Sequence, residues 1–274
     1  MPVSITESDV DAAAARLRGD GWWFSARQLY YATCAQVERP PAPVAQSEVG
    51  LGVLLVLVGA VTGNRIALLV LGSLGLLFIV AGIATRRGER RPRPLIRPLA
   101  IAFHDFERRF CDEPGRRQGL LPPSAPISSQ RAGTIVLCDR PETAAVLVAN
   151  AARLEGAGVA TAAAYRPMAD AEHVVVLHDC DPSGCALAGQ LRATGAVVAD
   201  AGINPGELTG RPLQCVEGAP ARVSDTVAAE LGPDAAEWLR SGRRLECATE
   251  SPEQLVQRVL AAIRNQPAQP AAGS

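Results

Sequence analysis

The sequence predicts an α/β fold: a parallel sheet with flanking helices, preceded by a short helical segment and a two-helix transmembrane hairpin. From Thr134 onward, short aliphatic runs alternate with helix-length segments, which is the pattern of a parallel sheet. Two long apolar runs fill residues 44–84, and a capped amphipathic segment precedes them. The expected domains are a helical segment (1–40), the hairpin (44–84), an Arg-rich connector helix and linker (85–133), the α/β domain (134–266) and a disordered tail (267–274).

Composition narrows the function classes. The 274 residues allow one large domain or two small ones, and a net charge of −1 gives no global basic signature of nucleic-acid binding. All 27 basic residues are Arg, which excludes lysine chemistry such as a Schiff base or a P-loop. The seven cysteines include no Cys-x-x-Cys pair, so a zinc site or disulfide framework is disfavoured and a reducing compartment is expected. The polar first 20 residues are unlike a signal peptide.

Two helices are expected at the N-terminal end. The first covers 5–19, and the second runs from 26 to about 38, before a Pro-Pro pair. Ser25 and Gln28 form a capping-box pattern at the start of the second helix. Its aromatic residues have the spacing of core residues, although they and Arg27 could instead contact a phosphate backbone.

The apolar runs at 44–62 and 66–84 are predicted to cross a membrane. The second run has nineteen uncharged residues, close to the ~20 that span a bilayer. An Arg cluster at 86–97 follows, and by the positive-inside bias it faces the cytoplasm. The expected location is therefore the inner (cytoplasmic) membrane, with both termini and the α/β domain in the cytoplasm. The alternative is a buried hairpin in a soluble core.

The segment between the hairpin and the α/β domain is expected to be a connector. An Arg-rich mixed helix is predicted over 95–112, and residues 113–133 have the composition of a linker. The helix could rest on anionic lipid, or it could pack on the next domain.

The α/β domain is predicted to contain alternating strands and helices. The expected strands are 134–138, 159–165, the run beginning at Val174, 195–203 and a possible edge strand at 213–216; the expected helices are 141–158, the stretch up to Leu191, 223–241 and 251–265.

Asp179 and Asp181 follow the strand that begins at Val174. Ligands bind at the carboxyl ends of strands in open α/β sheets. Two carboxylates this close repel each other unless a cation lies between them, and oxygen ligands suit Mg²⁺. In the alternative interpretation Asp179 is a turn residue and Asp181 only caps the following helix, whose first residue is Pro182. His178 points to the opposite face of the strand from Asp179 and is expected to be a core residue.

Five stretches together resemble the Toprim fold, and in detail the A subunit of topoisomerase VI and the related meiotic double-strand-break transesterases. LHDCDPSGCALA is similar to the Asp-x-Asp-Pro-x-Gly element of that family, and IVLCDRPETAAVL stands in the place of its first Toprim strand. ADAGINPGEL is similar to a strand exit downstream. In the closing stretch, Glu246, Ala248, Pro252 and Leu255 match the family pattern. FSARQLYYATC resembles the Arg-x-x-Tyr-Tyr helix of the winged-helix half. The resemblance covers roughly 26–38 and 134–265.

The resemblance implies a mechanism and partners. Asp179 and Asp181 would hold Mg²⁺ together with Asp139 or Glu142, and Tyr31 would attack a phosphodiester of nucleic acid, above all DNA, with Arg27 stabilising its phenolate. A family tyrosine acts on the metal site of a partner chain, so a homodimer is expected. Two departures stand out: the family glutamate of the first strand is replaced by Asp139, and the apolar hairpin stands where most of the winged helix should be.

Three functions are considered for the chain. The first is a membrane-tethered Toprim protein that acts on nucleic acid through Mg²⁺, as a nuclease or a topoisomerase-like transesterase. The second is a catalytically inactive Toprim-like membrane scaffold or binding module. The third, a phosphatase or receiver-like module, is disfavoured because the chain has no Lys and no Asp-x-Asp-x-Thr after its first strand.

Overall fold

The computed structural model describes residues 5–37, 101–112, 115, 117–128, 133–163, 173–208 and 216–265, with a few helical positions between 53 and 77. The chain divides into two compact units. One comprises Met1–Val37, Leu95–Leu208 and Leu213–Ser274, and the other comprises Glu38–Pro94 and Thr209–Pro212. The N-terminal helices and the α/β portion therefore belong to the same unit.

A four-stranded parallel sheet forms the centre of the larger unit, as the alternating pattern predicted. Its strands are β1 (Thr134–Cys138), β2 (Gly158–Thr161), β3 (His173–Leu177) and β4 (Val198–Asp200). They lie in the order β2-β1-β3-β4, and every neighbouring pair is parallel. The chain leaves β1 toward one edge of the sheet and leaves β3 toward the other. The gap between the carboxyl ends of β1 and β3 is thus the switch point at which open α/β sheets bind ligands.

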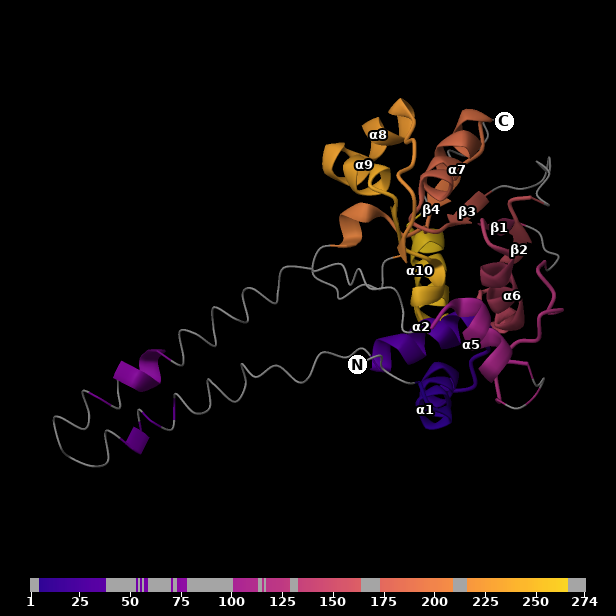
Figure 1. Ribbon diagram of the computed structural model, residues 1–274. Helices are drawn as coiled ribbons and strands as arrows, with labels where there is room; N and C mark the ends of the chain where they lie inside the picture. Colours follow the sequence, from indigo (N-terminus) through magenta and orange to yellow (C-terminus); the bar gives the residue numbers. More distant parts are fainter. Residues whose placement is uncertain are drawn as a thin grey trace. The chain divides into compact units, whose positions relative to one another are not determined.

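Helices cover both faces of this sheet. The helices α6 (Pro141–Ala149) and α10 (Pro252–Arg264) lie on one face, and α7 (Pro182–Ala193) lies on the other (Figure 1). The central strands are apolar on both sides because both sides are covered. Val136 and Val175 belong to the cluster that includes α6 and α10, whereas Leu137, Val174 and Val176 pack with α7.

Several elements differ from the sequence prediction in extent. The helix expected over 141–158 ends at Ala149, because the Asn150 side chain turns to donate to the Trp23 carbonyl at 2.8 Å. The single helix expected over 223–241 is two, since Gly232 has a positive φ and Pro233 starts a new helix. The remaining elements are α8 (Asp225–Leu231), α9 (Pro233–Arg240), a two-stranded antiparallel sheet of β5 (Val216–Glu217) and β6 (Arg243–Arg244), and the 3-10 helices η1 (Ala151–Arg153), η2 (Pro205–Leu208) and η3 (Cys247–Thr249).

Three helices form a second cluster on the same unit. They are α1 (Glu7–Arg18), α2 (Ala26–Val37) and α5 (Phe103–Phe110), and α2 also contacts η3. The predicted capping box is present at α2, where the Gln28 N–H donates to Ser25 Oγ at 3.2 Å and the Ser25 N–H donates back to the Gln28 side chain. Phe24, Leu29, Phe106 and the tyrosines of α2 supply the apolar interior.

The predicted transmembrane hairpin is corrected by the structure. Among the residues described, no helix is long and apolar enough to cross a membrane. The longest helix described, α10, has 13 residues, which at ~1.5 Å per residue is well short of the ~30 Å hydrocarbon core. Most of 44–84 lies outside the described residues. The transmembrane part of the fold prediction and the inner-membrane localisation are therefore not supported.

Candidate functional site

Two carboxylates meet at the switch point of the sheet. Asp139 directly follows β1 and Asp179 lies two residues after β3, and these two strands are neighbours. The Asp179 N–H donates to Asp139 Oδ2 at 2.8 Å. The sequence placed both residues at strand ends, and the pairing of β1 with β3 brings them together.

The turn between β3 and α7 is defined by Asp181. Its Oδ1 accepts hydrogen bonds from the Gly184 N–H and the Ser183 hydroxyl, both at 2.7 Å. The helix therefore begins as predicted, with Asp181 as its N-cap and Pro182 in the first turn. Gly184 is required here, because a Cβ at this position would collide with the Asp179 carbonyl oxygen. Burial alone would raise the pKa of Asp181, but these hydrogen bonds and the charge of Arg140 lower it below its usual value.

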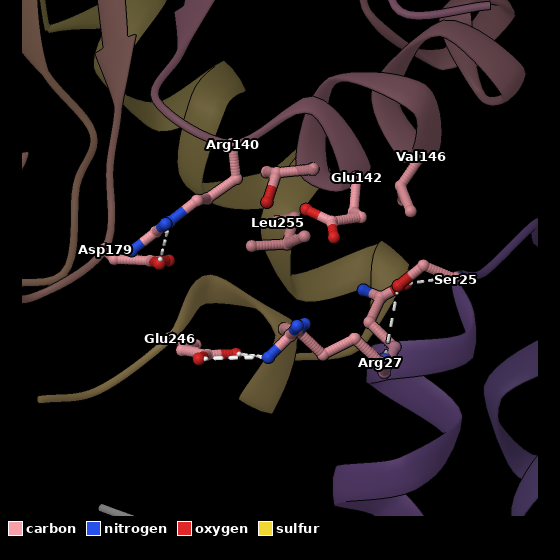
Figure 2. Close-up of a pocket in the computed structure, with 11 residues that line it drawn as sticks. Ser25, Arg27, Arg140, Glu142, Val146, Asp179, Glu246 and Leu255 are labelled. Atoms are coloured by element: carbon pink, nitrogen blue, oxygen red, sulfur yellow. Dashed lines mark hydrogen bonds and ion pairs between the residues drawn. The ribbon is translucent and has the colours of Figure 1, made fainter. Parts of the chain in front are cut away.

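Arg140 binds both aspartates of this turn. Its Nε donates to Asp179 Oδ2 at 2.8 Å and its Nη2 to Asp181 Oδ2 at 3.0 Å, and Figure 2 shows the guanidinium reaching toward Asp179. The Cys247 N–H donates to the second Asp179 oxygen at 2.7 Å. The two carboxylates were expected to need a cation, and the guanidinium of Arg140 is that cation.

In the described part of the chain, one carboxylate oxygen of Asp139 lacks the hydrogen bonds that Asp179 and Asp181 have. Its Oδ1 is buried and has no hydrogen-bond partner among the residues described. Burial, and next the nearby Asp179 carboxylate, raise the pKa of Asp139 to about 7. The charged form is disfavoured in a site that already holds two carboxylates, so near neutral pH Asp139 can hold or release a proton.

The arrangement does not fit the expected magnesium site. Mg²⁺ requires several oxygen ligands directed at one point. In the described portion of the chain, no group of three or more His, Cys, Asp or Glu side chains could hold a metal ion. The Asp179 and Asp181 oxygens are directed at Arg140 and at backbone N–H groups instead, and Glu142 lies on the first turn of α6.

The predicted nucleophile Tyr31 is buried. It is 3% exposed, and its ring lies 5.2 Å from that of Tyr30. Burial, and next the neighbouring Glu246 carboxylate, raise the pKa of Tyr31 far above its usual value, so its phenolate is disfavoured. Arg27 is paired with Glu246, with Nη1 3.1 Å from Oε2. These contacts favour the interpretation of Tyr31 as a core residue.

A pocket of about 90 Å³ lies between the N-terminal helices and the sheet. It is roomy enough for several water molecules. Figure 2 shows Arg140 with Asp179 on one wall, Arg27 with Glu246 on another, and Glu142 near them. The lining residues are Ser25, Arg27, Gln28, Arg140, Glu142, Thr143, Val146, Asp179, Glu246, Ala248 and Leu255. Arg27, Glu142 and Asp179 thus converge on one pocket, whereas Asp139, Asp181 and Tyr31 are not among its lining residues.

Two features of the site were not predicted from the sequence. Arg140 was not singled out, although an arginine directly after the acidic residue of the first strand is a visible signal. The second feature is the pair of buried contacts made by His178. His178 Nδ1 lies 2.7 Å from the Asp179 carbonyl oxygen, and His178 Nε2 lies 3.1 Å from Asp200 Oδ1. Within the part of the chain that the structure describes, the Nε2–H has no well-aligned hydrogen bond, and its contact with Asp200 is an ion pair.

The surroundings of His178 raise its pKa. Burial lowers the pKa of His178, but Asp200 and the Asp179 carbonyl outweigh burial and raise it to about 9. His178 is 0% exposed, as a core residue would be, yet it carries a charge at neutral pH. Its two ring nitrogens therefore connect the Asp179 turn, through the Asp179 carbonyl, with Asp200 of β4.

No protein-family model, curated protein or solved structure matches the chain.

Proposed function

We propose that this chain is a Toprim-like module that binds nucleic acid without cleaving it. The observation that carries the proposal is the position of Arg140, whose guanidinium pairs with Asp179 at 2.8 Å and with Asp181 at 3.0 Å. In the resemblance these carboxylates would hold the metal that stabilises charge developing on a phosphodiester. With the arginine bound to both, the carboxylate oxygens that would hold the metal are already paired with a cation.

The environment of Tyr31 supports the absence of cleavage. Nucleophilic attack by a tyrosine needs an activating base or a lowered pKa. Burial and the Glu246 carboxylate instead raise the pKa of Tyr31. Arg27, expected to stabilise the phenolate, is paired with Glu246.

Binding is supported by the location of the pocket and by its arginines. The pocket lies at the switch point, and Arg27 and Arg140 line it. The net charge of −1 limits the number of phosphates that the protein can neutralise. If one or two phosphates are contacted, the logarithm of affinity falls with that of salt concentration with a slope of about −1 to −2.

The test uses the full chain with end-labelled DNA and RNA, single-stranded and double-stranded, in Mg²⁺ and in Mn²⁺. We expect binding by fluorescence anisotropy, strands of unchanged length, and no label on the protein after denaturation. Shortened strands or a covalent label that is lost in Tyr31→Phe would overturn the absence of cleavage. No binding to any of these strands at low salt would overturn the proposal altogether.

A second candidate function, phosphodiester cleavage, is favoured by one observation. Asp139 has a buried, unpartnered Oδ1 among the described residues and a pKa raised to about 7, which suits a proton acceptor near neutral pH. In this case Asp139→Asn would abolish cleavage while leaving anisotropy unchanged. Cleavage that survives Asp139→Asn would exclude that role.

A further inference from the structure

We propose that the N-terminus of α6, together with Thr143, Arg27 and Arg140, forms a binding site for a phosphate group. The inference rests on the proposed function in that it specifies the contact through which a nucleic acid would bind. The same chemistry is carried by inorganic phosphate, so the site can be tested without a nucleic acid.

The first turn of α6 offers backbone donors to the pocket. The N-cap position is occupied by Arg140, whose side chain makes no capping hydrogen bond, and Pro141 follows in the first turn. The next N–H groups belong to Glu142 and Thr143, and both residues line the pocket. The first N–H groups of a helix lack intrahelical partners, and the helix dipole favours an anion there.

Thr143 supplies an independent indication of a ligand. The residue is 6% exposed and lines the pocket. Its hydroxyl makes no hydrogen bond with any residue in the described part of the chain. Because Thr143 lines the pocket, an oxyanion there would accept a hydrogen bond from this hydroxyl.

Both arginines retain donors after forming their ion pairs. Among the described residues Arg27 binds Glu246 through Nη1, and its Nε and Nη2 form the forked edge that suits a phosphate. Arg140 uses Nε and Nη2, which leaves Nη1. The two carboxylates hold the guanidinium groups in place, and Figure 2 shows both pairs at the same pocket.

Glu142 is the residue that opposes an anion. Glu246 is paired with Arg27, and Asp179 shares Arg140 with Asp181, whereas Glu142 lines the pocket and is exposed. Its charge acts on Arg27. Removing this charge while keeping the side-chain shape should therefore tighten phosphate binding.

The experiment measures the affinity of the full chain for inorganic phosphate by calorimetry, and for a labelled 20-nucleotide strand by anisotropy, with the same variants. For Thr143→Val, which removes the hydroxyl and keeps the shape, we expect binding weakened by about 5-fold. For Arg27→Gln we expect a loss of roughly 10-fold, as for a charged hydrogen bond. For Glu142→Gln we expect binding tighter by about 2- to 5-fold.

Two control variants keep the test specific. Arg264→Gln removes the same charge from an exposed ion pair with Glu155 outside the pocket and should leave both affinities unchanged. Thr143→Ser keeps the hydroxyl and should retain most of the affinity that Thr143→Val loses. Melting temperatures confirm that each variant is folded.

The outcomes separate this site from the proposed function. Phosphate binding that depends on Thr143 and Arg27, with no strand binding, would uphold the site and reject the proposed function. Strand binding that is equal in wild type, Thr143→Val and Arg27→Gln would uphold the function and reject the site. Phosphate affinities that change no more in these variants than in Arg264→Gln would also overturn the site.

Discussion

Two arginine–carboxylate contacts line the same pocket but differ in burial. The Asp179 and Asp181 side chains, which Arg140 binds, are 3% and 5% exposed. In the other contact, the Arg27 and Glu246 side chains are 30% and 22% exposed. Asp179 is also held by a backbone N–H from Cys247. In the first contact solvent reaches Arg140, which is 47% exposed, but not its carboxylates, whereas in the second it reaches both partners.

This difference in burial predicts different roles for the two arginines: Arg140 stabilises the fold, and Arg27 can bind a ligand. A buried carboxylate that loses its cation cannot be rehydrated, so its partner is needed for stability. A partly exposed pair contributes little to stability, because water can solvate either charge when the other is removed. Arg140 should therefore be needed to fold the turn, and Arg27 should be free to bind a ligand.

The largest expected effect is that of removing the cation from the buried contact. Arg140→Gln leaves Asp179 and Asp181 without their shared cation, and we expect a loss of about 2–3 kcal/mol, below the buried-pair range because Arg140 itself is half exposed. The free energy of unfolding in urea measures this loss. The matched variant Arg27→Gln should cost about 1 kcal/mol or less. Equal losses in the two variants would contradict the comparison.

The next effect concerns the buried histidine beneath the turn. The folded-state pKa of His178 is about 9, above its usual value of 6.5. Its stabilisation is therefore fully present below about pH 6.5 and is lost as pH rises through about 9. We expect the unfolding free energy of wild type to fall by about 2 kcal/mol over this window. His178→Gln should flatten this part of the profile, and an unchanged slope would place the titration elsewhere.

Asp139 should make the folding stability depend on pH in a lower range than His178 does. Its folded-state pKa is raised from 3.8 to about 7, so the unfolded chain ionises first and stability falls as pH rises from about 4 to about 7. Asp139→Asn can keep the hydrogen bond from the Asp179 N–H and removes the charge. The full rise corresponds to about 4 kcal/mol. Because Asp139 is only partly buried, we expect the variant to be more stable than wild type by a smaller amount, about 1–2 kcal/mol, at pH 7.5 and equal to it near pH 4. A variant that is less stable at both values would show that the carboxylate is ionised and paired.

The smallest effect is expected for Tyr31→Phe. The ring stays in the aromatic cluster and only the hydroxyl beside Glu246 is lost, so the cost should be below about 1 kcal/mol. Strand affinity should not change, because Tyr31 is not among the residues that line the pocket. A loss of strand binding with normal stability would place the tyrosine at the binding surface after all.

Elements with strong local signals were predicted from the sequence. The capping box at α2, and the N-cap of Asp181 with Pro182 after it, define helix starts through contacts within four residues. The aliphatic runs of β1 and β3 mark buried strands in the same way. The hairpin prediction was wrong because apolarity of a segment alone does not establish a continuous spanning helix, and no described helix is long and apolar enough.

The sequence by itself determined the alternation of strands and helices, the capped turn at Asp181, and the placement of Asp139 and Asp179 at strand ends. Tertiary structure alone decided which cation balances these carboxylates, because Arg140 and Asp179 are 39 residues apart and meet only when β1 pairs with β3. It likewise decided the contact of Arg27 with Glu246, across 219 residues. Helix and strand signals depend on neighbours along the chain, whereas the charge balance of a pocket depends on which distant segments the fold packs together.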